Sequence, residues 1–212
     1  MNSAKALVPE AVQRFFQNHP RVALAYSGGC DSVFLLACAH ACGAEVYPFT
    51  VDTAFQYAFE TDDARLAADQ VGVKGETIHL DIFAHPEITS NPPDRCYHCK
   101  KVIFSAIRDA AARRGIDTLI DGTNASDDPA RRPGFRALEE LNILSPLREA
   151  GLTKDDIRTL SRKMGLITAD KPNYSCLATR VEAGCPITPE LLESFVQEDW
   201  RSRETDDEHG TL

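Results

Sequence analysis

The sequence predicts an α/β fold, in which a parallel sheet carries helices on both faces. Two observations lead to this class. Short apolar segments, typical of strands buried in a parallel sheet, alternate along the chain with segments of helical periodicity. A glycine-rich turn over residues 27–32 joins the first of these strands to the helix that follows it.

Composition and charge support a globular protein of one α/β domain with a small appendage. Of the 212 residues, 43% are hydrophobic and 26% are charged, which predicts a packed core. No apolar segment approaches the roughly 20 residues that span a bilayer, and the first residues lack the pattern of a secretory signal. We therefore expect a cytoplasmic protein without membrane contact, whose seven cysteines are not paired in structural disulfides.

The expected elements follow one another in the order that this fold class requires. Helices are expected over residues 9–18, 31–41, 64–72 and 96–113, and strands over residues 21–26, 44–52, 76–82 and 118–123. Thr153 and Asp156 form the pattern of a capping box, which predicts a helix ending near Gly165. A further helix begins near Pro189, and the polar, acidic residues 201–212 are expected to form a loose tail.

The turn after the first strand has the composition of a phosphate-binding loop. It consists of Ser27, Gly28, Gly29, Cys30, Asp31 and Ser32. Adjacent glycines bring backbone N–H groups close to an anion, the following helix adds its dipole, and both serines add donors. Asp31 would repel phosphate unless it held a bridging Mg²⁺. The alternative is a plain strand-to-helix turn. The loop has no Walker A lysine, which points away from γ-phosphate transfer.

A second polar cluster follows the fourth predicted strand, where open α/β sheets bind their ligands. Gly122, Thr123 and Asn124 come directly after Asp121, and Arg132 lies eight residues beyond Asn124. Such a turn can be purely structural. Beside a phosphate loop, it predicts the far wall of a nucleotide site, in which Arg132 would stabilise charge on the α-phosphate.

Cys96 and Cys99 lie three residues apart, at the expected start of a helix. The helix dipole and the neighbouring basic residues Arg95, Lys100 and Lys101 lead us to expect lowered thiol pKa values. Such a pair can form a redox disulfide, half of a zinc site, or part of an iron–sulfur site. Cys176 and Cys185 are the candidates for further ligands, and three cysteines would leave one iron of a 4Fe–4S cluster without a protein ligand.

The hexapeptide of residues 27–32 resembles the signature of the PP-loop ATP pyrophosphatases. This resemblance implies that ATP is cleaved between its α- and β-phosphates. It also implies that residues 27–32 hold the pyrophosphate and that the substrate is adenylated.

Five motifs in order resemble a narrower family, the LarE-type sulfur transferases of nickel-pincer nucleotide cofactor biosynthesis. They are SGGCDS, NPPDRCYHCKK, DGTN with RRPGFRAL, SPLREAGLTKDDIR and KPNYSCLATR. The family adenylates a carboxylate of pyridinium-3,5-biscarboxylic acid mononucleotide and replaces an oxygen with sulfur. Because the three cysteines Cys96, Cys99 and Cys176 are present, the resemblance implies the 4Fe–4S subtype, with a catalytic role for Cys176 and a sulfide donor.

The resemblance also implies an organisation of the chain. Residues 1–168 would form the PP-loop domain, residues 169–200 a C-terminal sulfur-transfer region shorter than that of the family, and residues 201–212 an acidic tail. Partner chains of a homo-oligomer could complete the substrate site. Two other functions stay open: a PP-loop tRNA 2-thiolation enzyme, and a non-catalytic ATP- or cluster-binding remnant. The net charge of −9 disfavours a nucleic-acid partner.

Overall fold

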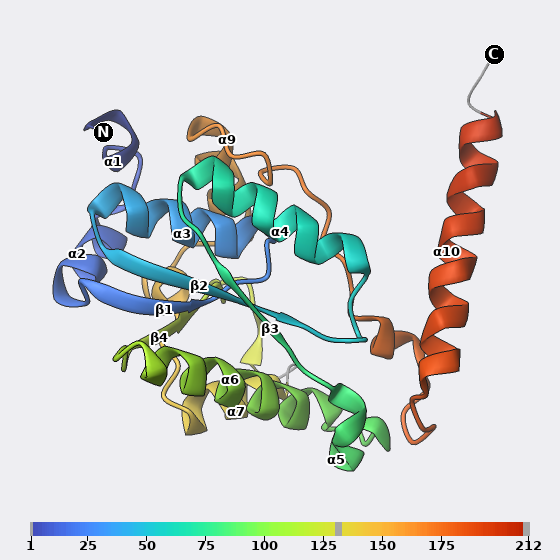
Figure 1. Ribbon diagram of the computed structural model, residues 1–212. Coiled ribbons are helices and arrows are strands. Elements are labelled where there is room, and N and C mark those ends of the chain that lie inside the picture. Colours follow the sequence, from blue (N-terminus) through green and yellow to red (C-terminus); the bar gives the residue numbers. More distant parts are fainter. Residues whose placement is uncertain (1, 130–132, 210–212) are drawn as a thin grey trace.

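A four-stranded parallel sheet forms the centre of the protein (Figure 1). The computed structural model describes the backbone of residues 2–129 and 133–209, and the side chains of residues 4–129 and 133–200. The strands are β1 (Arg21–Ala25), β2 (Glu45–Asp52), β3 (Glu76–His79) and β4 (Leu119–Asp121), in the order β3-β2-β1-β4. All pairings are parallel, so the carboxyl ends of the strands meet at one edge. The predicted α/β class is confirmed.

Helices cover both faces of this sheet. One face carries α3 (Cys30–Cys42), flanked by α2 (Glu10–Asn18), α4 (Ala58–Val71) and α9 (Lys154–Lys163), and the short α1 (Asn2–Lys5) also contacts α3. The opposite face carries α6 (Arg95–Arg113) and α7 (Gly134–Glu140). Short helices α5 (Pro86–Thr89) and α8 (Pro146–Glu149) complete the connections. Helices α1, α5, α7 and α8 are not among the expected elements, because segments of four to seven residues have too little periodicity to be recognised.

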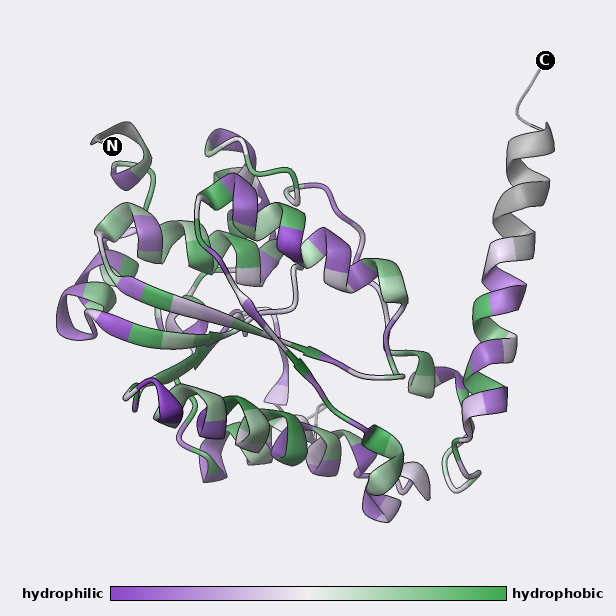
Figure 2. Ribbon diagram, in the orientation of Figure 1, coloured by the Kyte–Doolittle hydropathy of each residue, from purple (hydrophilic) through white to green (hydrophobic). Residues whose placement is uncertain are grey.

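Two apolar clusters hold the layers together. Figure 2 shows largely hydrophobic residues along β1 and α3, and α3 is buried on nearly all sides because α2, α4 and α9 pack around it. Cys30 and Cys38 are 2% and 0% exposed in this core, so both act as packing residues. The second cluster joins α6 and α7 to the other face through residues such as Phe49, Ile107 and Leu138.

The third predicted strand is shorter than expected. It ends at His79, because the Asp81 carboxylate accepts a 3.0 Å hydrogen bond from the N–H of Phe83 and caps a 3₁₀-helix, η1 (Ile82–Ala84). This turn leads through α5 to the start of α6. The turn therefore places the first turn of α6 beyond the carboxyl edge of the sheet.

The C-terminal part consists of a 3₁₀-helix, η3 (Leu177–Arg180), and the long helix α10 (Pro189–His209). Leu177 and Ala178 pack with Phe55 and Ile88 in a third apolar cluster, while α10 projects away from the sheet (Figure 1). Residues 201–209 were expected to form a loose tail, and this expectation is wrong, because α10 continues to His209. Glutamate and arginine favour a helix even where the segment has no apolar face. Within the described residues, none of the helices is long and apolar enough to cross a lipid bilayer.

Candidate functional site

The turn between β1 and α3 has the backbone geometry of an anion-binding loop. Gly28 has φ +69°, and a Cβ atom there would come within 2.5 Å of the Ala64 backbone, so only glycine fits. Gly29 is the N-cap of α3 and has no side-chain cap, which leaves N–H groups of the first turn available to a ligand. Ser27 Oγ and Ser32 Oγ lie 3.2 Å apart beside these groups.

Asp31, in the first turn of α3, has one satisfied and one unsatisfied carboxylate oxygen. Its Oδ2 accepts a 2.8 Å hydrogen bond from Lys154 Nζ and a 3.4 Å one from Asn124 Nδ2. Its Oδ1 is buried and has no hydrogen-bond partner among the described residues. A buried carboxylate oxygen without a donor fits a metal cation, so the donor set at Asp31 suits the Mg²⁺ that a nucleotide would bring.

The loop after β4 lies directly against the first turn of α3. A Cβ atom on Gly122 would come within 3.0 Å of the Ser32 nitrogen, so glycine permits this close approach. Asp121 is buried and accepts hydrogen bonds from Thr123 Oγ1 at 2.5 Å and from Ser145 Oγ at 2.7 Å. The predicted nucleotide-site residues Gly122, Thr123 and Asn124 therefore adjoin residues 27–32. Arg132 lies outside the described residues.

Lys154 is a site residue that the sequence analysis missed. It is the first residue of α9, after the N-cap Thr153, and it forms an ion pair with Asp31. The capping box of Thr153 and Asp156 is confirmed. A lysine is unfavourable at the positive end of a helix dipole, and that misplaced charge was the signal available in the sequence.

The three candidate cluster ligands lie close together at the same edge of the sheet. Cys96 and Cys99 occupy the first turn of α6, and Cys176 is the N-cap of η3. The backbone N–H of Leu177, next to Cys176, donates a 2.9 Å hydrogen bond to the carbonyl of Phe55, and Cys99 packs against the same apolar cluster as these two residues. Cys96 and Cys176 are exposed and Cys99 is half-buried, so the group is open to solvent.

Arg95 and Asn91 hold Cys176 against the start of α6. Arg95 Nη1 donates hydrogen bonds to Asn91 Oδ1 at 2.5 Å and to the carbonyl of Ala178 at 2.7 Å. Asn91 Nδ2 in turn donates to the carbonyl of Glu182 at 2.8 Å. Both side chains are buried. Neither role was predicted, because the contact joins segments more than 80 residues apart.

The expected lowering of the thiol pKa is wrong for Cys99, one of the two cysteines for which it was expected. Burial raises the pKa of Cys99 to about 12, with smaller contributions from the charges of Cys176 and Cys96. Cys176 is exposed as a residue, but its sulfur is partly enclosed by protein atoms, and this desolvation raises the pKa of its thiol. Desolvation of the Cys99 thiolate outweighs the nearby cations Arg95 and Lys100, so both of these candidate ligands are neutral thiols at neutral pH.

No three His, Cys, Asp or Glu side chains in the described part of the chain already stand in a metal-binding arrangement. The thiols are nevertheless the donor type that iron–sulfur clusters require, and two of them sit on solvent-facing turns. The three cysteines therefore offer the donor atoms that a cluster requires. Their side chains would have to move to bind one.

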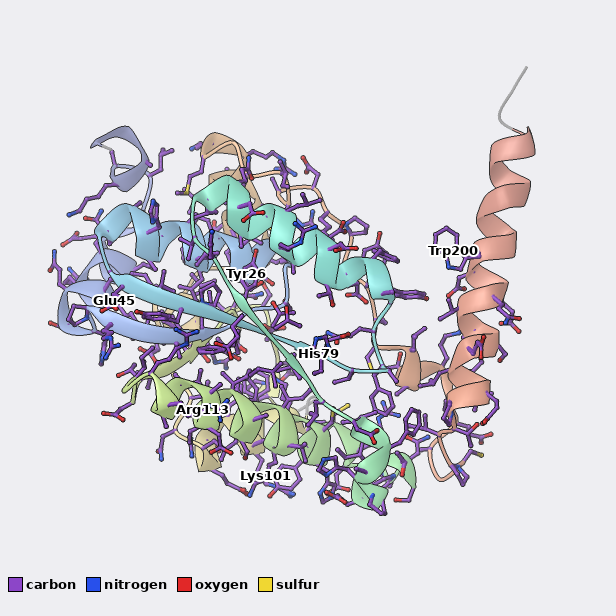
Figure 3. All side chains as sticks on the ribbon, viewed as in Figure 1. Tyr26, Glu45, His79, Lys101, Arg113 and Trp200 are labelled. Atoms are coloured by element: carbon purple, nitrogen blue, oxygen red, sulfur yellow. The ribbon has the colours of Figure 1, made fainter. Side chains whose placement is uncertain are left out.

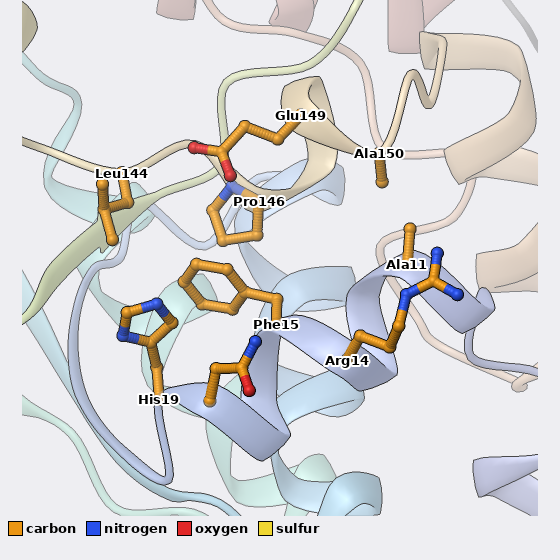
Figure 4. A pocket seen from close by; sticks show the side chains of 9 residues that line it. Ala11, Arg14, Phe15, His19, Leu144, Pro146, Glu149 and Ala150 are labelled. Carbon is orange, nitrogen blue, oxygen red and sulfur yellow. The ribbon is translucent and has the colours of Figure 1, made fainter.

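A large open pocket is unrelated to either group. Its volume is about 480 Å³, and it lies between α2 and α8 (Figure 4). Phe15, stacked on His19, and Pro146 line it. None of the predicted site residues contributes to its lining.

Comparison with known proteins gives relatives but no matching family model. An uncharacterized protein of Synechocystis sp. is 34% identical over 185 residues, 87% of this chain and 69% of that protein. The pyridinium-3,5-bisthiocarboxylic acid mononucleotide synthase of Lactiplantibacillus plantarum is 31% identical over 170 residues, 79% of this chain and 62% of the synthase. The tRNA-specific 2-thiouridylase MnmA of Beijerinckia indica is 26% identical over an alignment of 223 positions, 81% of this chain and 51% of the enzyme.

The parallel sheet and the glycine turn before α3 define an α/β protein of the PP-loop class. Within it, the chain belongs to the same family as the Synechocystis protein, and the L. plantarum synthase is a homologue. The chain spans about two thirds of the length of these two relatives. The L. plantarum synthase and the B. indica thiouridylase are both named as enzymes that make sulfur-containing products.

Proposed function

We propose that this chain is an ATP-dependent sulfur transferase that adenylates a carboxylate of pyridinium-3,5-biscarboxylic acid mononucleotide, releases pyrophosphate and replaces an oxygen with sulfur. The name of the L. plantarum homologue, a bisthiocarboxylic acid mononucleotide synthase, supports the substrate and product class. The observation that supports the proposal is that the glycine turn after β1 and the segments that carry the three cysteines lie at the carboxyl ends of the strands.

ATP would bind between residues 27–32 and the loop after β4. Backbone N–H groups at the start of α3, with Ser27 and Ser32, would hold the β- and γ-phosphates. Gly122, Thr123 and Asn124 would form the opposite wall. Asp31 would hold Mg²⁺, which neutralises phosphate charge when bound. Arg132 is proposed to stabilise the α-phosphate as the carboxylate attacks it.

Cys96, Cys99 and Cys176 are proposed to hold a 4Fe–4S cluster. Such a cluster, with three protein ligands, leaves one iron able to carry a sulfide from an external donor. The first turn of α6 and the start of η3 would present it towards the adenylated carboxylate. Arg95 and Asn91 fix the distance between these two elements, so they would set the spacing of the ligands.

The organisation of the chain also belongs to this proposal. Residues 1–168 would bind ATP, residues 169–200 would deliver sulfur, and residues 201–212 would add an acidic end. The third proposed ligand, Cys176, lies in the second of these regions. A cytoplasmic homo-oligomer, in which a partner chain completes the substrate site, is the assembly we expect.

The decisive experiment combines pyrophosphate release with cluster analysis. Anaerobically reconstituted protein should show iron, acid-labile sulfide and a brown absorbance, and should release pyrophosphate from ATP only with the pyridinium dicarboxylate nucleotide. Asp31→Ala should abolish release while retaining iron. Reconstituted protein that contains zinc or no metal would reject the cluster mechanism, and unchanged release by Asp31→Ala would reject the metal-binding role of Asp31.

A tRNA 2-thiolation enzyme is the second candidate, because MnmA enzymes are among the homologues. It would use the same phosphate loop to adenylate a base. The net charge of −9 opposes a long-range attraction to tRNA. Direct tRNA binding separates the two candidates.

A further inference from the structure

The ion pair between Lys154 and Asp31 joins α9 to α3, two helices that also pack against each other. The backbone N–H of Lys154 donates a 3.0 Å hydrogen bond to Ser126 Oγ, and the N–H of Ala125 donates a 2.8 Å bond to the carbonyl of Leu152. These contacts tie the start of α9 to the loop after β4. The position of Lys154 is therefore fixed by the backbone, and its side chain is directed at Asp31 with Nζ 2.8 Å from Oδ2.

The position of Lys154 is electrostatically costly unless an anion is present. A cation in the first turn of a helix opposes the helix dipole. The ammonium and the carboxylate are 21% and 22% exposed, so both have lost much of their contact with water. Each therefore depends on the other, or on a ligand, for charge compensation.

Lys154 and a metal cation would compete for the carboxylate of Asp31. Lys154 and Asn124 both donate to Oδ2, while the buried Oδ1 has no partner among the described residues. A divalent cation that approached this carboxylate alone would meet the ammonium of Lys154 and be repelled by it. A metal-bound polyphosphate differs, because it brings oxygens that can accept the hydrogen bonds of Lys154.

We propose that Lys154 is a place-holder cation for the nucleotide site. It neutralises Asp31 until a nucleotide arrives, then moves to a phosphate oxygen as Mg²⁺ takes its place on Asp31. The metal consequently enters together with the nucleotide and not ahead of it. This inference rests on the proposed ATP site and is independent of the sulfur step. Lys154 acts here as a positioning and phosphate-binding residue.

The proposal predicts two effects of opposite sign for Lys154→Met. Without the competing ammonium, Mn²⁺ alone should bind about fivefold more tightly, the change expected for one partly exposed ion pair. An ATP analogue with a methylene bridge between its α- and β-phosphates, added with Mg²⁺, should bind at least about tenfold more weakly, because a charge-assisted hydrogen bond is lost. Electron paramagnetic resonance measures the first affinity and calorimetry the second.

Three further variants make the test specific. Lys154→Arg should keep both affinities near wild type, since it retains the charge. Lys163→Met removes an exposed charge at the other end of α9 and should change neither. Lys154→Gln, which can still donate to Asp31, should also bind Mn²⁺ more tightly and the ATP analogue more weakly. It replaces the methionine variant in the test if that variant does not fold.

The outcomes separate this inference from the function on which it rests. If Lys154→Met and Lys154→Gln bind Mn²⁺ no more tightly than wild type, or bind the analogue equally well, the place-holder role is rejected. Wild-type protein that fails to bind the analogue at all would instead reject the proposed ATP site, and the inference with it.

Discussion

Arg95 Nη1 donates a 2.7 Å hydrogen bond to the carbonyl of Ala178, two residues beyond Cys176. The same nitrogen donates to Asn91 Oδ1, and the Arg95 side chain is buried at 9% exposure. Because Cys96 follows Arg95 directly, this one guanidinium joins the two chain segments that carry the three cysteines. The relationship predicts that Arg95 controls whether the third cysteine reaches the other two.

Replacing Arg95 with methionine tests this role. The change leaves the Ala178 carbonyl and the Asn91 amide oxygen without their buried donor, which costs about 1–3 kcal/mol of unfolding free energy. We also expect a loss of iron from reconstituted protein, because the segment carrying Cys176 loses its hydrogen bond to the first turn of α6. Urea unfolding and iron analysis measure the two effects.

The matched control for this variant is Arg113→Met at the exposed far end of the same helix, labelled in Figure 3. It should retain wild-type stability and iron content. If Arg95→Met kept its full iron content, the guanidinium would not position the ligands.

The cysteines are predicted to divide into two groups. Alanine at any one of Cys96, Cys99 or Cys176 should remove the iron and sulfide and stop sulfur transfer, because two thiolates hold a cluster poorly. Cys185 is exposed, like Cys96 and Cys176, and Cys185→Ala should keep the cluster and the activity. Iron retained in Cys176→Ala together with iron lost from Cys185→Ala would reverse the ligand assignment.

Two glycines with positive φ provide a test of the phosphate loop. Gly43 has φ +78° and open space where a Cβ atom would lie, so Gly43→Ala should cost only about 1–2 kcal/mol of unfolding free energy. Gly28 has φ +69° and would also place its Cβ within 2.5 Å of Ala64, which should cost about 1–3 kcal/mol more.

Nucleotide binding should separate these variants further. Gly28→Ala is expected to lose affinity for the ATP analogue because the turn must shift, whereas Gly43→Ala, at the far end of α3, should keep it. Equal affinities, measured by calorimetry, would place the nucleotide away from residues 27–32.

Binding of tRNA should be weak. With a net charge of −9, we expect a dissociation constant no tighter than about 10⁻⁵ M at physiological salt. A gel-shift titration over a range of salt concentrations measures it. Tight binding that weakens steeply with salt would favour the tRNA-thiolating candidate over the one proposed here.

Much of the fold could be predicted because it depends on local sequence. The four strands and the long helices follow from apolar runs and periodicity, and their parallel arrangement follows from their alternation. The shortening of β3 at His79 depended on a cap by Asp81. The extension of α10 to His209 depended on intrinsic propensity in a segment without an apolar face.

The sequence by itself determined the chemistry of the candidate site. The glycine turn with Asp31 predicts an anion loop with a place for a metal, and the three cysteines predict thiol ligands. Only the tertiary structure decided which residues from distant parts of the sequence contact these groups. Lys154 reaches Asp31 across 123 positions, and Arg95 reaches Ala178 across 83. Burial also decided that the pKa of Cys99 rises, against the local dipole and cations. Desolvation and long-range hydrogen bonds depend on which segments pack together, and no local pattern of residues encodes that packing.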